Sequence, residues 1–346
     1  MSDVLVSHPQ IDLAPPISTA TLRGIILVKG VGGLGNRMLS FLTASLLAEV
    51  AGRRLLVDWR DSIFTGRAGT APDLFGALFV SPIVDPLPVN IECRSVIPAL
   101  WQGRLNETLA VVGRGYDPDF HNRFGSFRDL AVNLRRYDYD ENVLLVFWSW
   151  REVVRPLRSS LASMDRRYKA MSDWEILREA ARHYLRPREN TSAAVDEFIA
   201  RNFGQRMLGL HIRATDMRAP VEKLMQTAIR IAAREKCDGV FLSTDNAEVE
   251  NRVRSALPNV VTQPKELPKG AVPLHYDPNC ADRVKRATQA LTDMLLLSRC
   301  QCLTYAARSS FGCMAGIFAP PGQVTVDVDR FNPRIRAKKF LQSWIY

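Results

Sequence analysis

Residues 24–59 read GIILVKGVGGLGNRMLSFLTASLLAEVAGRRLLVDW, and this stretch decides the fold class. The apolar run at its start predicts a buried strand. A glycine-rich turn follows, and apolar residues at helical spacing then predict a helix over 36–51, with Asn36 as its cap and Gly52 at its end. The apolar run at 55–59 predicts the next strand. A strand, a turn, a helix and a strand in this order form a βαβ unit, which indicates a parallel sheet.

The chain after Gly204 alternates strands and helices a second time. Strands are predicted at 207–211, 240–243, 260–261, 301–304 and 324–326, and helices at 221–234, 247–256, 281–299 and 310–318. Two α/β halves that meet near residues 190–205 are the simplest architecture, and ligands of such sheets lie beyond the carboxyl ends of the strands. We therefore expect a flexible leader at 1–22, a first Rossmann-like domain at 23–200, a second at 201–330 and a tail at 331–346.

The charge balance of the chain favours anionic partners. Among 346 residues there are 46 Lys and Arg against 36 Asp and Glu, which gives a net charge of +10. Nucleic acid, phosphorylated sugars and an acidic membrane surface all suit such a charge. Much of the excess lies in Arg151–Arg188 and in Arg330–Lys339. Basic residues interleaved with acids are usually a solvated helix face, so charge alone does not choose among these partners.

Membrane and disulfide signals are weak in this sequence. It has no uncharged apolar run of the length that crosses a bilayer, and its start lacks the basic end and apolar core of a signal peptide. We expect a cytoplasmic protein, and association with the inner face of the membrane stays open. Six cysteines do not form a disulfide framework in a chain of this length, so we expect Cys300 and Cys302 to be buried free thiols rather than metal ligands.

Two segments follow strands and carry groups suited to phosphate. The turn at 30–35 can admit a phosphate or a sugar at the N-terminus of the next helix, but its glycine spacing fits neither the Rossmann fingerprint nor the Walker form, and a plain tight turn explains it as well. His211 ends the strand at 207–211, and Arg213 and Asp216 follow in the next five positions. A guanidinium there can hold two oxygens and neutralise a departing diphosphate. An Arg213–Asp216 ion pair that closes a turn is the structural alternative.

Asp245 and the serines at the start of a later helix form a second group of candidates. Asp245 ends a strand, where it can contact a nucleoside or cap the helix that starts at Ala247. Ser309 and Ser310, followed by Phe311, open the helix at 310–318 and suit phosphate, although a serine N-cap is the commoner explanation.

Asp293 lies in an apolar helical run. A carboxylate there is costly unless it is paired, so we interpret it as a structural brace held by Arg299 or by a main-chain N–H group. We expect no metal site.

Taken together, these segments resemble the GDP-fucose-dependent fucosyltransferases, that is the α1,2, α1,6 and protein O-fucosyl groups, with the NodZ type among the α1,6 members. The similar stretches are GGLGNRM at 32–38, LLVDWR at 55–60, HIRATD at 211–216, DMLLLS at 293–298 and SSF at 309–311. Arg37 and the Gly-Cys pair after Phe311 depart from the α1,2 pattern, whereas VDWR leans towards the NodZ type. Both an α1,2 and an α1,6 linkage stay open.

The resemblance implies a GT-B fold of two facing Rossmann-like domains, an inverting mechanism, and no need for a metal or cofactor. GDP-fucose would bind the second domain, and an oligosaccharide or glycolipid acceptor the first. Carried over residue by residue, Arg213 would stabilise the leaving GDP, His211 and Asp216 would shape its loop, and Asp245 would contact the nucleoside. The remaining nucleotide-sugar residues would be Gly33, Gly35, Asn36, Ser309, Ser310 and Phe311.

An inverting transfer also needs a general base for the acceptor hydroxyl. Glu222 follows the HIRATD segment, as a glutamate does in the α1,6 group, but an acid at a helix start is favoured by the dipole whatever the function. Asp58, at the end of a strand, is the second candidate. Two other functions stay open: a GT-B transferase for another nucleotide sugar, and a non-catalytic binder of RNA or an anionic glycan. Nucleic acid is the less favoured partner, because no RNA-binding pattern stands out.

Overall fold

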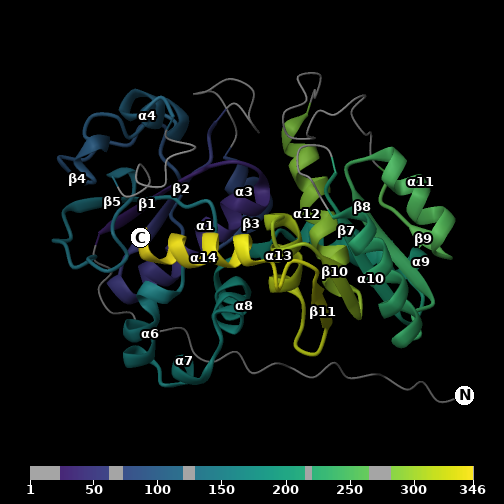
Figure 1. The fold of residues 1–346 in the computed structure, drawn as a ribbon. Coiled ribbons are helices and arrows are strands. Elements are labelled where there is room, and N and C mark those ends of the chain that lie inside the picture. Colours follow the sequence, from purple (N-terminus) through teal and green to yellow (C-terminus); the bar gives the residue numbers. More distant parts are fainter. Residues whose placement is uncertain (1–23, 62–72, 120–128, 215–219, 265–281, 346) are drawn as a thin grey trace, which may run out of the picture.

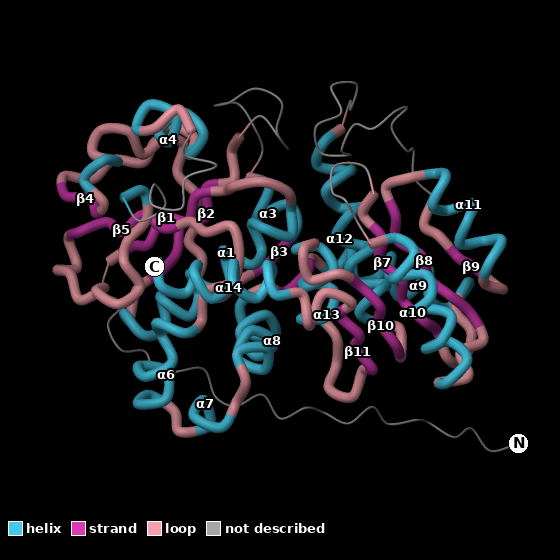
Figure 2. The backbone as a smooth tube through the Cα atoms, in the orientation of Figure 1, coloured by secondary structure: helices cyan, strands magenta, loops and turns pink. Residues whose placement is uncertain are grey.

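The computed structural model of the protein describes residues 24–61, 73–119, 129–214, 220–264 and 282–345. It has two parallel sheets, each with helices around it, which lie side by side (Figure 1). Figure 2 shows the strands in magenta among the cyan helices. A third sheet is small, because Phe79–Val80 pairs antiparallel with Arg186–Pro187. The α/β class with parallel sheets is therefore confirmed.

The first sheet is built on the βαβ unit that the sequence predicts. Its strands are β1 (Ile25–Lys29), β2 (Arg54–Asp58), β4 (Ser95–Ile97) and β5 (Val143–Phe147), in the order β2-β1-β5-β4, all parallel. The chain proceeds from β1 to β2 on one side and places β5 on the other. The crevice at such a reversal, beyond the carboxyl ends of the strands, is where α/β sheets bind ligands.

Helix α1 (Leu34–Ala51) covers this sheet and is buried along most of its length. It begins two residues earlier than predicted, with Gly33 and not Asn36 at the N-cap. Gly52 ends it as expected, with φ +62°, a left-handed conformation that glycine adopts without steric cost.

Shorter elements fill the irregular first half and the basic stretch after it. They are α3 (Leu74–Leu78), β3 (Phe79–Val80), η1 (Ala99–Trp101), α4 (Leu109–Tyr116), η2 (Arg155–Leu157), α6 (Arg158–Met164), α7 (Arg167–Ala170), α8 (Asp173–Tyr184), β6 (Arg186–Pro187) and α9 (Glu189–Asn202). The sequence analysis did not predict α9. This helix packs against α12 of the second half, so the proposed division near residue 200 stays a prediction.

The second sheet follows the predicted alternation closely. Its strands are β7 (Met207–Ile212), β8 (Gly239–Thr244), β9 (Val260–Val261), β10 (Cys302–Tyr305) and β11 (Val324–Asp327), in the order β11-β10-β7-β8-β9. Its helices are α10 (Val221–Arg234), α11 (Ala247–Ala256), α12 (Arg283–Arg299) and α13 (Ser310–Phe318). The strand order reverses between β7 and β10, so a second ligand crevice is expected at their carboxyl ends.

One hydrophobic cluster spans the two halves, and a second lies within the second half. A single buried cluster runs from the β1 and α1 side chains through α8 to α12 and α13. Helix α13, which belongs to the second sheet by sequence, packs against α1 and α8 of the first half. The ends of both sheets are thereby held together.

The segment predicted as a tail contains a helix, α14 (Pro333–Ile345), which runs back from the second half to η2 of the first (Figure 1). Within the described ranges, no helix is long and apolar enough to cross a membrane. Cys300 and Cys302 are buried free thiols, as predicted.

Candidate functional site

The glycine turn after β1 is shaped by Arg37. Its guanidinium donates to the carbonyl of Gly32 at 3.0 Å and to that of Trp59 at 3.4 Å, and forms an ion pair with Asp61. The arginine is fully buried, and a Cβ on Gly30 would collide with it. Arg37 therefore joins the turn to the end of β2 and fixes the N-terminus of α1.

The same turn meets the start of α13 across the boundary between the halves. A Cβ on Gly35 would lie 2.7 Å from the carbonyl carbon of Ser310 and 2.8 Å from the nitrogen of Phe311, so only glycine allows this approach. The Ser310 hydroxyl donates to Asn36 Oδ1 at 3.0 Å, and Asn36 Nδ2 donates to the Trp150 carbonyl at 2.7 Å. Asn36 was predicted as a helix cap, but its side chain links the two halves instead.

Two helix N-termini thus converge at one place. Helix α1 begins at Leu34 after Gly33, which has no side chain to cap it, and α13 begins at Ser310 after Ser309, whose side chain does not bond to the helix backbone. Helix N-termini present free N–H groups and a partial positive charge, which attract anions. This convergence suits a diphosphate group.

His211, at the end of β7, organises the second-half side of the site. Its Nε2 lies 3.0 Å from the hydroxyl of Ser309, and its ring stacks on Phe311 with centroids 4.6 Å apart and planes at 18°. Ser309 occupies the N-cap position of α13, yet its hydroxyl bonds to His211 and not to the helix backbone. The carboxyl ends of β7 and β10 are therefore joined by side chains from the segments HIRATD (211–216) and SSF (309–311).

Asp245 holds the loop that carries Arg213. Its Oδ1 accepts from the Ala214 N–H at 2.7 Å, whereas the cap of α11 is Asn246, which accepts from the Val249 N–H at 3.0 Å. The expectation that Asp245 caps α11 is therefore wrong. Arg213 is half-buried at the end of β7. Asp216 lies outside the described residues.

Arg151 is a site residue that the sequence analysis missed. It follows β5, donates to the Ala307 carbonyl at 2.6 Å and to Cys313 Sγ at 3.2 Å, and pairs with Glu152 at 3.2 Å. Burial alone would lower the pKa of this guanidinium, but the charges of Glu152 and Cys313 raise it. Arg151 joins the first half to the loop that precedes α13.

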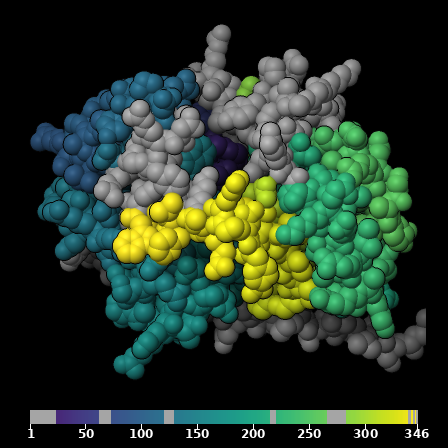
Figure 3. All heavy atoms as spheres, in the orientation of Figure 1, coloured from purple at the N-terminus to yellow at the C-terminus, as the bar shows by residue number. Residues whose placement is uncertain are grey.

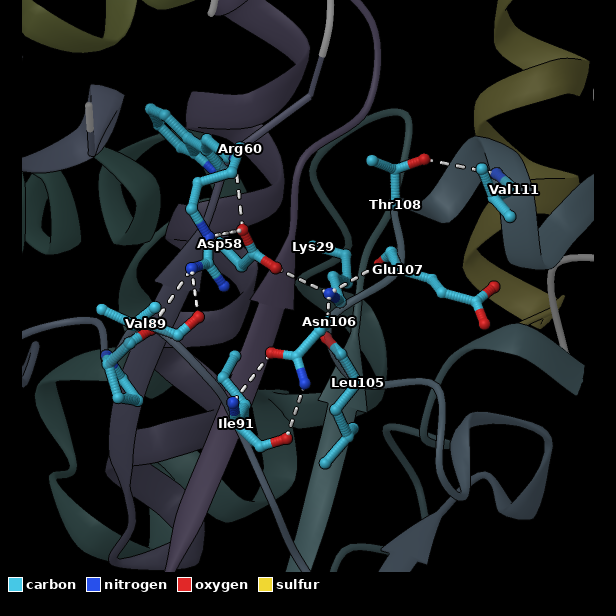
Figure 4. A network of polar contacts seen from close by, with 12 residues as sticks. Lys29, Asp58, Arg60, Val89, Ile91, Leu105, Asn106, Glu107, Thr108 and Val111 are labelled. Carbon is cyan, nitrogen blue, oxygen red and sulfur yellow. Dashed lines mark hydrogen bonds and ion pairs between the residues drawn. The ribbon is translucent and has the colours of Figure 1, made fainter. Parts of the chain in front are cut away.

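The position of Asp58 at a strand end suggested that it faces the ligand crevice, but the structure shows it buried. It is buried at 6% exposure, and its two oxygens accept from Lys29 Nζ at 2.7 Å and Arg60 Nε at 3.0 Å (Figure 4). Burial would raise the pKa of this carboxyl, but the cations of Lys29 and Arg60 lower it. The residue is held ionised between two cations, which makes it a poor acceptor for a proton.

Lys29 is the buried centre of this network. Its ammonium donates to the carbonyls of Leu105 and Glu107 as well as to Asp58, and so uses all three protons (Figure 4). The arrangement secures the chain before α4 to the ends of β1 and β2. A single lysine at the end of a strand gives no sequence signal for this role.

Glu222 lies at the start of α10 with a side chain that is 69% exposed, and it forms an ion pair with Arg252 of α11. Glu222 can therefore be a residue that only begins the helix. The second oxygen of its carboxylate takes no part in the ion pair with Arg252.

Asp293 is a brace, as interpreted from the sequence, but with a different partner. Its Oδ2 accepts from the Ser243 hydroxyl of β8 at 2.7 Å, whereas Arg299 lies 3.5 Å from Asp196 of α9. Over the ranges that the structure covers, no group of three His, Cys, Asp or Glu side chains could hold a metal ion.

The family model of nodulation protein Z (NodZ) matches residues 164–336, which is half of the chain. The chain belongs to the NodZ family.

Relatives of known name agree with this membership. Nodulation protein Z of Bradyrhizobium diazoefficiens is 26% identical over 319 residues, which cover 83% of this chain and 77% of that protein. Among solved structures, NodZ α-1,6-fucosyltransferase soaked with GDP-fucose is similar with a TM-score of 0.58 and 21% identity, over 90% of this chain and 97% of that one. POFUT1 in complex with GDP has a TM-score of 0.51 at 13% identity, over 89% and 99%. These structures confirm the GT-B fold.

The residues that match the NodZ family model include one part of the site and not the other. His211, Arg213, Asp245 and the segment Ser309–Phe311 lie within residues 164–336. The glycine turn and Asn36 lie before that range, so their part in the site rests on the contacts with α13.

Proposed function

We propose that this NodZ-family chain transfers fucose from GDP-fucose to a hydroxyl group of a glycan, with inversion at the anomeric carbon and without a metal ion. The observation that carries the proposal is the cluster of His211, Ser309 and Phe311 at the carboxyl ends of β7 and β10, which adjoins the converging N-termini of α1 and α13. The relatives named above include a fucosyltransferase soaked with GDP-fucose and one in complex with GDP.

The donor diphosphate would lie beside the two touching helix N-termini, at the carboxyl ends of β7 and β10. Gly35 allows the two backbones to come close, and Asn36 and Ser310 hold the two helix starts together at 3.0 Å. We assign Gly33, the N-cap of α1, to the same pocket. Backbone N–H groups and a hydroxyl at this place would bind phosphate oxygens. Phe311, stacked on His211, would form an apolar wall of the same pocket.

Arg213 would stabilise the leaving GDP. A guanidinium positioned where negative charge grows as the glycosidic bond breaks lowers the barrier, because the charge is met by a fixed dipole or cation. Asp245 supports this role by fixing the neighbouring backbone through Ala214. We also assign to Asp245 a contact with the nucleoside, and to Asp216 the shaping of the Arg213 loop.

The acceptor would bind the first half, which the Lys29–Asp58 network rigidifies. We propose an oligosaccharide or glycolipid acceptor, an α1,6 or α1,2 linkage, and a protein that acts in the cytoplasm at the inner face of the membrane. Of the two base candidates, we propose Glu222, because Asp58 already accepts from two cations and its pKa is lowered.

Nucleotide titration tests the proposal. Thermal shifts of the full chain are compared for GDP, UDP and a short RNA, and product linkage and anomeric configuration are then determined by NMR. We expect stabilisation by GDP, weaker stabilisation by UDP, and turnover that EDTA does not change. Stabilisation by RNA without stabilisation by GDP would favour the binding protein that the charge of +10 suggests, and UDP alone would indicate another nucleotide sugar.

A further inference from the structure

The end of the chain carries an unusual concentration of exposed apolar side chains. Phe331 is 80% exposed, Phe340 53%, Leu341 52% and Trp344 56%. The other large apolar side chains that are exposed in the described ranges are spread over the rest of the molecule, with no more than two on any one element: Val80, Val89, Val111, Tyr116, Met164 and Ile229. Phe340, Leu341 and Trp344 lie within five positions of one helix, and exposed apolar side chains gathered in this way mark an interaction surface.

The same segment is basic and contains no acid. Between 330 and 346 the sequence has no Asp or Glu and five basic residues: Arg330, Arg334, Arg336, Lys338 and Lys339. The three arginines of this set are exposed. Figure 3 shows α14 lying across the visible face of the molecule, over the first half.

Arginines of the first half extend this surface beyond the helix. The rings of Phe340 and Trp344 lie 6.0 Å apart, and the guanidinium of Arg155 lies 5.5 Å from the centre of each. Arg135 lies 5.7 Å from the Trp344 ring. Cations from η2 and from the loop at Arg135 therefore lie against the half-exposed rings of α14, and Arg334 and Arg336 add exposed charge on the same helix. We call Phe331, Arg334, Arg336, Phe340, Leu341 and Trp344, together with Arg135 and Arg155, the α14 surface.

We propose that the α14 surface binds an anionic lipid bilayer. Aromatic side chains prefer the membrane–water interface, where an apolar ring meets polar headgroups, and neighbouring Lys and Arg are attracted to anionic lipids. Leu341 favours a bilayer over nucleic acid, because an exposed aliphatic side chain can enter the acyl region but offers no aromatic face on which a base could stack. The inference rests on the proposed location at the membrane and is separate from the transfer reaction.

Vesicle flotation with the full chain tests this inference. Vesicles of phosphatidylcholine alone are compared with vesicles in which one third of the lipid is phosphatidylserine. We expect at least tenfold tighter binding to the anionic vesicles, and weakening at high salt because the charge attraction is screened.

Two pairs of variants separate the rings from the charges. Phe340→Ser with Trp344→Ser removes the rings and keeps the cations, and Arg334→Gln with Arg336→Gln does the reverse. Each cation near an anionic surface contributes about fivefold to affinity, so the arginine pair should lose roughly thirtyfold. The ring pair should lose at least tenfold. Matched controls are Val111→Ser with Ile229→Ser for exposed apolar residues, and Arg182→Gln with Arg201→Gln for exposed cations; both should bind as the unchanged protein does.

Equal binding to both vesicle types, unchanged binding in both α14 variants, or equal losses in the controls would overturn the proposal. Binding of a short RNA in place of vesicles would also overturn it. Thermal stabilisation by GDP is measured in every variant and should stay the same. If the unchanged protein lacks fucosyl transfer but still binds anionic vesicles through α14, the proposed reaction fails and this inference stands.

Discussion

Ser310 and Asn36 are 274 positions apart in the chain, yet the serine hydroxyl donates to the asparagine carbonyl at 3.0 Å. This bond and the close approach at Gly35 hold the N-termini of α1 and α13 together. The diphosphate pocket that we propose therefore depends on both halves of the molecule.

Replacement of Gly35 by alanine should open this contact. The new Cβ would lie 2.7 Å from backbone atoms of Ser310, which must move. Overpacking of this kind costs about 1–3 kcal/mol, and we expect at least a tenfold loss of transfer rate and a smaller thermal shift with GDP. Gly115→Ala in α4 is the matched control, because a Cβ there has ordinary contacts at 3.5 Å. Equal activity of the two variants would show that the approach of α1 to α13 is not needed.

The Asp58 ion pairs predict acid sensitivity of the fold. The pKa of Asp58 is lowered in the folded state, so the unfolded chain binds more protons and the free energy of unfolding decreases as the pH falls below about 5. Asp58→Asn also leaves Lys29 buried without its counter-charge, which costs about 3–5 kcal/mol. Urea unfolding from neutral pH down to pH 4 checks both effects.

The matched control is Asp173→Asn, which alters an exposed ion pair with Arg158. Its free energy of unfolding should equal that of the unchanged protein. A free energy of unfolding for Asp58→Asn that matches this control would contradict the structural role of the network.

Glu49 predicts the opposite pH dependence. It is half-buried in α1 and accepts from Tyr168 at 3.2 Å and Tyr184 at 3.4 Å, and burial raises its pKa. A raised pKa means that the folded state binds more protons, so this contribution to stability is present at low pH and is lost as the pH rises through the folded pKa. Glu49→Gln keeps an acceptor for the tyrosines and should remove that loss. A steeper loss of stability with rising pH in this variant would contradict the assignment.

The sequence predicts the regular elements well because their signals are local. The helices at 221–234, 247–256 and 310–318 have the predicted bounds, and Gly52 ends α1. Apolar periodicity and a glycine that adopts positive φ act within a few residues.

Local sequence patterns did not predict the hydrogen-bond partners of several side chains. Asn36 and Asp245 both lie beside a helix start, where a cap is the local expectation, but they bond to Trp150 and Ala214 from distant loops. The partner of Asp293 is Ser243 of a neighbouring strand for the same reason. Contacts made by folding depend on which loops meet, and local sequence patterns do not reveal which loops these are.

The central claim is tested most directly by the rate of fucosyl transfer from saturating GDP-fucose to a glycan acceptor, measured for Arg213→Ala and Arg213→Lys. Loss of a group that stabilises charge only in the transition state costs about 3–4 kcal/mol, so the alanine variant should be slower by a factor of roughly 100–1,000 with an unchanged melting temperature. Lysine should also be slow, because it keeps the charge but loses the two-pronged geometry. Arg201→Ala, at an arginine that is 73% exposed on α9, should transfer at the normal rate. Near-normal rates in either Arg213 variant would contradict the account.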